Sequence, residues 1–565
     1  MDRLLKNVLT LFLLVFIAIN ISASSSPPKK YDLLIKNGKV INGTGNPWFY
    51  ADIGIQAGKI TAIGDLSKAE AEKTLNAKNL IVCPGFIDMH THCDSELGDP
   101  RCQANLNYLA QGVTTVVTGN CGESVSIDVL NTKQKWEKQG IGTNVVYLVG
   151  HGSIRREVMG NAPRKATPEE IEKMKSLARK AMEEGAWGMS TGLEYIPGRF
   201  ADTQEVIEII RIVAEYKGIH TTHMRDEAGR IIEAIKEIIR ITEETKVRSI
   251  ISHLKVTGKN NWGLMKKAVQ TIADARNRGI YITADQYPYI KSAPIGLLST
   301  FLEIPKDMQP LSKLRAQVYR SQWQEKDRDK ALAAYHRELI KTLKDKEKHN
   351  MIKQLTVKGR PNDPSAVAMW GWHDFTILVA PKNKHLEGKN FIDIARELDR
   401  DMFDILVNLV IDEPDILYGG GSQSEQDHNY ALSQSWVMVS SDGSALPVIK
   451  ESAKPVRGHP REFGSQTKVL RKYVREKKLL SLEDAIRKMT SLPASVLQMK
   501  KRGMLLEGYT ADLVIFDPET VRDNSTYSDS FKYPSGIEYV IINGKVSIKK
   551  GEYKGALYGK VLLMN

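Results

Sequence analysis

Short apolar runs alternate with longer amphipathic stretches through the middle of the chain. The runs are typical of buried strands, and stretches such as residues 169–184 and 231–245 repeat apolar positions at helical spacing. Strands that alternate with helices form parallel βαβ units, because each crossover helix returns the chain to the same end of the sheet. The pattern therefore predicts an α/β protein with a TIM-like (β/α)8 barrel over residues 84–500. The eight predicted strands are residues 81–87, 113–118, 144–149, 187–190, 219–222, 247–252, 280–284 and 436–440.

Both ends of the chain have a different pattern, with short alternating segments separated by glycine turns. Asn543-Gly544 between two such segments is a hairpin signal. We expect the two ends to pair as one small β-sandwich, formed by residues 31–83 and 501–560. Its predicted strands are residues 31–41, 51–56, 59–63, 511–516, 537–542 and 543–548.

The seventh and eighth barrel strands are separated by a segment too long for one crossover helix. It contains a highly charged helical stretch over residues 321–348. We therefore predict an insertion over about residues 290–367, after which residues 370–388 return towards the barrel.

The N-terminus has the three parts of a secretory signal peptide. Arg3 and Lys6 precede an apolar run over residues 8–19, and small residues follow at 22–25. The run is shorter than a comfortable membrane span. Residues 1–23 are therefore predicted to be cleaved, so that an exported, periplasmic or extracellular protein with no stable membrane span remains.

The amino-acid composition indicates which class of molecule the protein binds. The 565-residue chain has a net charge of +13, but its basic residues are interleaved with acidic ones, and no stripe of basic and aromatic residues stands out. This favours a small-molecule anionic substrate over nucleic acid. The four cysteines, Cys83, Cys93, Cys102 and Cys121, are too few for a disulfide scaffold, although a Cys83–Cys102 or Cys93–Cys102 bridge stays open.

Five predicted barrel strands end in histidine or cysteine residues, which can bind a metal ion, or in an aspartate. Functional groups of a parallel barrel gather where its strands end, so these side chains share one mouth. The two-residue spacing of the first pair places both on one face of an extended segment. Imidazoles and a thiolate suit Zn²⁺ better than Mg²⁺ or Ca²⁺, which prefer oxygen. The residues are His90, His92, Cys121, His223, His253 and Asp442.

Motifs along nearly the whole mature chain resemble the amidohydrolase superfamily, and within it the D-aminoacylases, or N-acyl-D-amino-acid deacylases. Many amidohydrolases carry a metal-bridging lysine on the fourth strand, whereas residues 187–191 (WGMST) offer none, and the resemblance implies that Cys121 replaces it. The motifs are PGFIDMHTH (84–92), GVTTVVTGNCG (112–122), GAWGMSTGLEY (185–195), THMRDE (222–227), ISHLK (251–255), ADQYPY (284–289), SSDG (440–443), HPREFG (459–464) and MTSLPA (489–494).

The resemblance also implies roles for the site residues. Cys121, His223 and His253 would hold a tightly bound zinc. His90 and His92 would complete a second, weaker metal position, which Cys121 could bridge.

The resemblance also implies which residues transfer protons and which residues bind the substrate. Asp442 would act as general base and acid, and Lys255 and Arg461 would bind the α-carboxylate of the substrate. Tyr287 and Tyr195 are weaker candidates for the pocket wall.

The chemistry agrees with these roles. Zinc polarises a carbonyl and lowers the pKa of bound water to about 7, and a neighbouring carboxylate can pass the proton of that water to the leaving amine. The resemblance therefore implies hydrolysis of N-acyl-D-amino acids, or of dipeptides that contain a D-amino acid, to a carboxylate and a free D-amino acid.

Three alternatives stay open. The first is a hydrolase of cyclic amides, similar to dihydroorotases or hydantoinases, although those relatives typically carry the fourth-strand lysine. The second is an enzyme that opens a β-aspartyl or other peptide bond from its amino-terminal side. The third is a barrel without catalysis, used for binding, which the full set of ligand types and Asp442 argues against.

Overall fold

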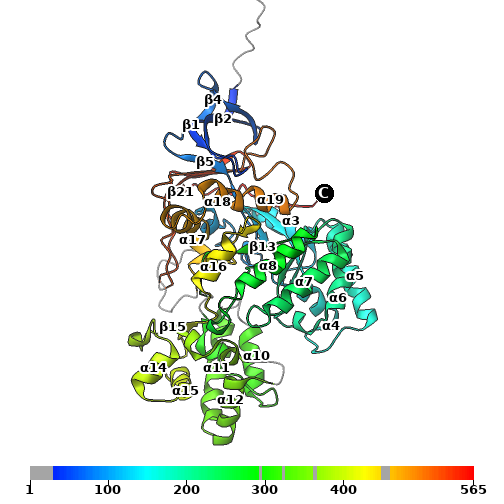
Figure 1. The fold of residues 1–565 in the computed structure, drawn as a ribbon, viewed down its shortest axis with the longest axis vertical. Helices are drawn as coiled ribbons and strands as arrows, with labels where there is room; N and C mark the ends of the chain where they lie inside the picture. Colours follow the sequence, from blue (N-terminus) through cyan, green and yellow to red (C-terminus); the bar gives the residue numbers. More distant parts are fainter. Residues whose placement is uncertain are drawn as a thin grey trace, which may run out of the picture.

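The three-dimensional structure is a computed structural model that describes residues 30–291, 295–320, 325–360, 365–446, 458–527 and 529–564. The predicted signal peptide, residues 1–23, lies outside the described residues. Figure 1 shows a β-rich part at the top, an α/β part in the middle and a mainly helical part at the bottom. Within the part of the chain that is described, no helix has the length and apolarity that crossing a membrane requires.

The central part is the predicted barrel of parallel strands. One run of the barrel pairs in the order β6-β7-β8, and the other pairs in the order β9-β10-β11-β12-β13-β17. Backbone hydrogen bonds from Asp442 to His90 and from His92 to Gly443, both 2.8 Å long, join the ends of β17 and β6. The strands are β6 (Phe86–Asp88), β7 (Val113–Thr118), β8 (Asn144–Tyr147), β9 (Val149–Gly150), β10 (Gly188–Gly192), β11 (Ile219–His223), β12 (Arg248–Ile251), β13 (Ile282–Gln286) and β17 (Val437–Val439).

The structure divides the third predicted strand, residues 144–149, into β8 and β9. The cause is β22 (Val561–Leu562), which pairs in parallel with β8 through Val145 and Val146. Because β22 occupies that edge of β8, only the short β9 pairs with β10. The end of the chain therefore forms part of the barrel wall, which the sequence did not predict.

Helices pack around the barrel. Two of them show why their sequences are helical: α5 begins with Pro168 and a reciprocal capping box between Thr167 and Glu170, and α7 buries a face of isoleucines. The helices are α2 (Leu106–Leu109), α3 (Val129–Gln139), α4 (His151–Met159), α5 (Pro168–Glu183), α6 (Thr203–Glu215), α7 (Ile231–Thr245), α8 (Met265–Asn277), α16 (Glu425–Leu432), α17 (Arg461–Lys468), α18 (Leu482–Met489) and α19 (Ser491–Val496), with a π-helical segment at Val469–Glu476.

A dry core fills the barrel. Inward side chains of the strands, such as Val117, Ile219 and Met438, pack against Ala494 and Val496 of α19, which lies across one end of the barrel. Since this end is plugged, the open mouth lies at the carboxyl ends of the strands, as in other barrels of this type.

The two chain ends form one domain, as predicted. Their strands belong to a single sheet in the order β21-β20-β19-β18-β5-β1-β2-β3, with β4 paired to β1, and they enclose one apolar core. The strands are β1 (Lys30–Val40), β2 (Phe49–Gln56), β3 (Lys59–Gly64), β4 (Glu70–Asn76), β5 (Ile81–Pro84), β18 (Leu513–Phe516), β19 (Ile537–Ile542), β20 (Lys545–Lys549) and β21 (Glu552–Tyr553).

The junction of the two domains corrects the first predicted barrel strand. Residues 81–87 form β5, which pairs with β1 and β18 in the domain of the chain ends, and then β6 of the barrel. The break is at Gly85, where a Cβ would lie 2.2 Å from Oγ1 of Thr114. Only glycine allows this close approach.

The insertion is longer than predicted. Its sheet pairs β14 and β15 with β16, and its own apolar core extends from Leu297 to Tyr418. The predicted end at residue 367 is therefore too early, and residues 370–388 belong to the insertion rather than returning to the barrel. Its elements are β14 (Ile295–Gly296), α9 (Leu297–Thr300), α10 (Leu311–Arg320), α11 (Glu325–Leu343), α12 (Lys346–Lys358), α13 (Ala366–Trp370), β15 (Thr376–Val379), α14 (Phe391–Leu398), α15 (Met402–Asp412) and β16 (Leu417–Gly419).

Candidate metal centre

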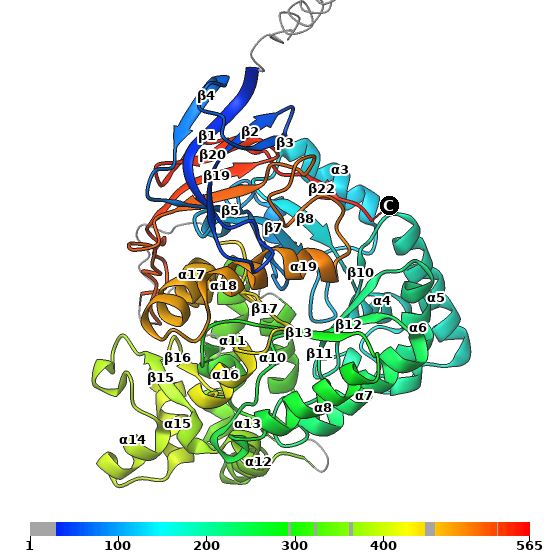
Figure 2. The same cartoon turned by 45° about the horizontal axis from the view of Figure 1, so that its top comes forward.

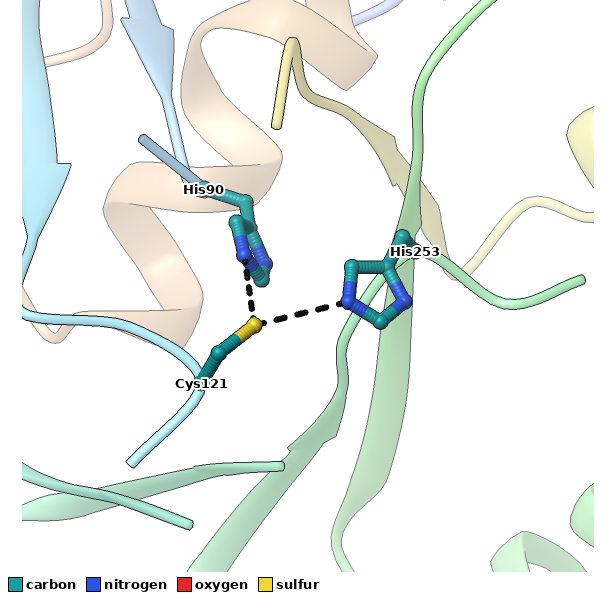
Figure 3. A group of neighbouring side chains, drawn as sticks. All are labelled: His90, Cys121 and His253. Atoms are coloured by element: carbon teal, nitrogen blue, oxygen red, sulfur yellow. Dashed lines mark hydrogen bonds between the residues drawn. The ribbon is translucent and has the colours of Figure 1, made fainter. Parts of the chain in front are cut away.

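The residues predicted as metal ligands meet at the carboxyl end of the barrel. His90 and His92 follow β6, Cys121 follows β7, His223 ends β11 and His253 follows β12. Figure 3 shows the sulfur of Cys121 between the rings of His90 and His253, which come from opposite sides of the mouth.

The distances between the inward-facing atoms fit a single small cation. Cys121 Sγ lies 3.3 Å from His90 Nε2, 3.5 Å from His253 Nε2 and 3.8 Å from His223 Nδ1. His223 Nδ1 and His253 Nε2 are 3.0 Å apart. A tetrahedral zinc with bonds of about 2.0 Å to nitrogen and 2.3 Å to sulfur would separate its ligand atoms by roughly 3.3–3.6 Å. The spacing is therefore that of a zinc ligand set.

Carboxylates lie behind the histidines and orient them. His223 Nε2 donates to Glu194 Oε2 at 2.7 Å, and Glu227 Oε1 lies 2.8 Å from His253 Nδ1. Asp285 accepts from the backbone N–H of His253 and lies 3.7 Å from His90 Nδ1. The hydrogen bond to Glu194 fixes the proton of His223 on Nε2, as such partners do at metal sites. Nδ1 of His253 lies between Glu227 and Lys255, whose Nζ is 2.8 Å away.

This arrangement supplies a test of whether a metal fits. His223 faces Glu194 through Nε2 and faces Cys121 and His253 through Nδ1. Burial alone would raise the pKa of the Cys121 thiol, but charge on His90 and hydrogen bonds from three histidines hold that pKa well below its ordinary value. The sulfur and the ring nitrogens therefore need positive charge between them, which protons on the histidines supply here and a metal ion could supply in their place. The donor set therefore fits a bound metal ion.

A second group of ligand atoms adjoins the first. His90 Nε2 lies 3.3 Å from His92 Nε2, and Asp442 Oδ1 lies 3.1 Å from His92 Nε2 and 3.4 Å from His90 Nε2. The His92 side chain is 31% exposed, whereas that of His90 is fully buried. The outer group is thus wetter and shares His90 with the inner group.

Three of the site residues have a backbone conformation that is rare outside glycine. Cys121, His253 and Asp442 have φ values of 53°, 36° and 53°. The left-handed region costs about 1–3 kcal/mol for such residues, and it persists where the surrounding structure enforces it. The sharp turns after β7, β12 and β17 direct these side chains into the mouth.

Asp442 joins the metal ligands to a buried arginine. Its Oδ1 faces the histidines, while its Oδ2 accepts from Arg461 Nη1 at 2.6 Å. Burial would raise the pKa of Asp442, but the charges of Arg461 and His253 and a hydrogen bond from His92 hold it well below its usual value.

The two predicted carboxylate-binding cations lie beside one aromatic ring. Lys255 Nζ lies 5.9 Å and the guanidinium carbon of Arg461 5.2 Å from the ring centre of Tyr287. Lys255 also pairs with Glu227 Oε2 at 2.6 Å. Arg461 has a buried Nε without a hydrogen-bond partner in the described part of the chain.

The aromatic candidates take different positions. Tyr287 is buried, and its hydroxyl accepts from Gln423 at 3.3 Å. Tyr195 is 46% exposed and its ring centre lies 4.3 Å from that of His223, so it borders the mouth on the side of β11.

Other histidines and cysteines stay outside the metal centre. His151 binds Glu205 at 3.1 Å, and His220 lies between Thr191 and Ser249 inside the barrel wall. Cys93 packs against Thr91, and all four cysteines are free thiols, so neither of the disulfides left open by the sequence forms.

Sequence reasoning missed Glu194 and Asp285 as partners of the metal ligands. Asp285 lies near the end of β13, and Glu194 follows β10 by two residues. The rule that chemistry gathers at strand ends could have identified both, since they stand in the motifs at 284–289 and 185–195.

The comparisons with known proteins agree with this geometry. The profile of the amidohydrolase family matches residues 73–300 and 455–548. A D-aminoacylase of Alcaligenes xylosoxydans xylosoxydans is 32% identical over 95% of this chain and 99% of its own. A solved D-aminoacylase, described as having a binuclear metal centre, is 29% identical with a TM-score of 0.72 over 95% of this chain and all of its own.

A further similar structure contains zinc. The N-acyl-D-glutamate deacylase of Bordetella bronchiseptica, solved with zinc and a phosphonate mimic of the tetrahedral intermediate, is 29% identical with a TM-score of 0.71 over 95% of this chain and all of its own. The ligand-bearing strand ends, the missing fourth-strand lysine and these similarities lead to one conclusion: the chain belongs to the amidohydrolase family, as a hydrolase of the D-aminoacylase group that acts on linear amides.

Proposed function

We propose that this protein is a zinc-dependent hydrolase of the amide bond of N-acyl-D-amino acids, or of dipeptides that contain a D-amino acid. Water adds to the acyl carbonyl, the C–N bond breaks, and the products are a carboxylate and a free D-amino acid. The relatives named above support the substrate class. The donor set at the barrel mouth supports the metal.

Cys121, His223 and His253 would hold the tightly bound zinc, and His90 and His92 a second, weaker metal position. When bound, the metal polarises the substrate carbonyl and makes a water molecule more acidic. The chain contributes the orientation of the ligands through Glu194, Glu227 and Asp285.

Asp442 is the proposed general base and acid. Its Oδ1 lies on the side of the histidines, where the attacking water must be, and its Oδ2 is held by Arg461. Oδ1 would accept the proton of the water and then donate it to the departing amine. Because Arg461 fixes the carboxylate, the proton moves to and from one defined oxygen.

Arg461 and Lys255 would bind the α-carboxylate of the substrate. The unpaired, buried Nε of Arg461 is the observation that carries this assignment, because a buried donor without a partner is costly and a substrate carboxylate would satisfy it. Tyr287, between the two cations, and Tyr195, at the edge of the mouth, would form the pocket wall.

The single observation that carries the function is the thiolate-and-histidine cluster with Asp442 beside it. The test is release of free amine from N-acetyl-D-methionine and N-acetyl-L-methionine by chelator-treated protein, with and without added Zn²⁺. We expect turnover of the D form only, restored by zinc. Turnover of a hydantoin or dihydroorotate, with none of the linear amides, would instead establish the cyclic-amide alternative.

Export is proposed from the sequence of residues 1–23. N-terminal sequencing of the protein recovered from the cells and medium of an expressing bacterium tests it. A mature chain that starts near residue 24 is expected, whereas an intact Met1 would contradict cleavage.

A further inference from the structure

The barrel has a cavity of about 450 Å³ at the end opposite the metal centre. It lies where α8 ends, where β13 and β17 begin, and beside α18 and α19, which are drawn in orange near β17 in Figure 2. Its walls include Arg276, Tyr281, Thr283, Trp436 and Arg487. The metal ligands follow the carboxyl ends of their strands, so this cavity is separate from the site described above.

Two of the arginines at the cavity lack carboxylate partners within the described part of the chain. Arg276 donates to the carbonyl of Ile282 and lies 5.6 Å from the ring centre of Trp436. Arg248 lies 4.6 Å from the ring centre of Tyr281. Among the residues that the structure describes, neither arginine makes an ion pair with a carboxylate, whereas Arg487 is paired with Asp484.

Lys488 is a further cation near the cavity and makes no ion pair with a carboxylate among the described residues. It is fully buried next to the cavity-lining Arg487, and its Nζ donates only to the carbonyls of Gln434 and Val437 within the described chain. Burial lowers the pKa of Lys488 to about 8 and also lowers the pKa of Arg276. Charges that burial disfavours in this way would be stabilised by an anion.

One residue of the cavity wall also has a buried polar atom without a partner. Thr283 is 3% exposed, and its Oγ1 makes no hydrogen bond within the described structure. Buried hydroxyls are nearly always paired, because an unpaired one costs about 1–3 kcal/mol. Thr283 and Arg276 line the same cavity, so an unpaired hydroxyl and a guanidinium without a carboxylate partner stand in one wall.

We propose that this cavity binds a small aromatic carboxylate. Arg276 would bind the carboxylate, Thr283 would donate to it, and the faces of Trp436 and Tyr281 would contact the planar ring. The volume is in the range of small-ligand pockets, which combine apolar walls with a few placed polar groups. Binding there is independent of the metal and of the reaction proposed for the mouth.

The experiment is a ¹⁹F NMR titration of the full-length protein with 4-fluorobenzoate. The probes 4-fluorobenzamide and acetate test the charge and the ring, and each is expected to bind at least about tenfold more weakly. Absence of saturable 4-fluorobenzoate binding, or equal affinity for either comparison probe, would overturn the proposal.

Variants then assign the binding to this cavity. Arg276→Gln should weaken 4-fluorobenzoate binding at least about tenfold and Thr283→Val about threefold or more, since charge-assisted and neutral hydrogen bonds are lost. Arg278→Gln is the matched control, because Arg278 is exposed on the same helix end and outside the cavity wall. Bound metal and melting temperature, measured in parallel, establish that each variant is folded. Unchanged affinity in folded Arg276→Gln would contradict the assignment.

Discussion

Asp442 has two carboxylate oxygens with different partners, the histidines on one side and Arg461 on the other. Asp442→Asn keeps the size of the side chain but removes its ability to accept a proton. We expect the tightly bound metal to remain and kcat to fall by about 10²–10⁴-fold. Steady-state kinetics and metal analysis of the same preparation measure both effects. Asp399→Asn, at an exposed position of the insertion, is the control, and near-normal turnover of Asp442→Asn would show that another group moves the proton.

Cys121 and Cys93 provide a matched pair of buried thiols close to the mouth. Cys121 faces three histidines, whereas Cys93 faces Thr91. Cys121→Ala should lose the tightly bound zinc on dialysis against a weak chelator, because the thiolate is its only anionic ligand in the inner group. Cys93→Ala should retain it. Equal zinc content of the two variants would refute the ligand assignment.

Arg461 is expected to act on binding more than on turnover. Arg461→Ala should raise KM for N-acyl-D-amino acids about tenfold or more, because a charge-assisted contact to the α-carboxylate is lost. The same substrates with an amidated carboxyl group serve as the control, since they cannot make this contact. Equal losses with both substrate sets would place the role of Arg461 in holding Asp442 alone.

At the scale of elements, α5 shows how local sequence defines a helix start. Thr167 and Glu170 each accept a hydrogen bond from the backbone N–H of the other. Thr167→Ala should lower the free energy of unfolding by about 1 kcal/mol without changing metal content, whereas Thr167→Ser should retain most of the stability. Chemical denaturation compares the two, and an equal loss in both would exclude the cap as the cause.

Elements whose sequence pattern lies within their own residues were predicted correctly, whereas elements defined by pairing with distant residues were not. The range of α7 agrees with the predicted helix over residues 231–245, because its isoleucines repeat at helical spacing. The end of the insertion could not be read in the same way, because β15 belongs to it through pairing with β16, about forty residues later, and through packing in its core. Strand pairing over such separations leaves no periodic signal in the sequence.

The site was more predictable than the fold around it. Strand-end positions identified every side chain of the inner and outer candidate ligand groups. Glu227, which lies behind His253, stood only within the 222–227 motif. The pairing of Lys255 with Glu227 and of Arg461 with Asp442 was not predictable, because it depends on how turns with positive φ direct the side chains.

For the whole molecule, β22 connects the end of the chain to the barrel wall. Trp187 donates to the carbonyl of Leu562 at 2.6 Å, and Met564 donates to that of Gly185. Deletion of residues 559–565 should therefore lower the melting temperature by a few degrees, about 1 °C for each kcal/mol lost in a chain of this size. Deletion of residue 565 alone is the control. An unchanged melting temperature of the longer deletion would show that β22 adds no stability.

The same strand constrains the order of events during synthesis. The edge of β8 that β22 covers, and the edge of β5 that β18 covers, stay open until these two later strands have left the ribosome. Contacts between such distant segments are slow to form, because loop closure must precede them. The nascent barrel therefore exposes open strand edges for most of its translation, and a chaperone that covers them should raise the yield of folded protein.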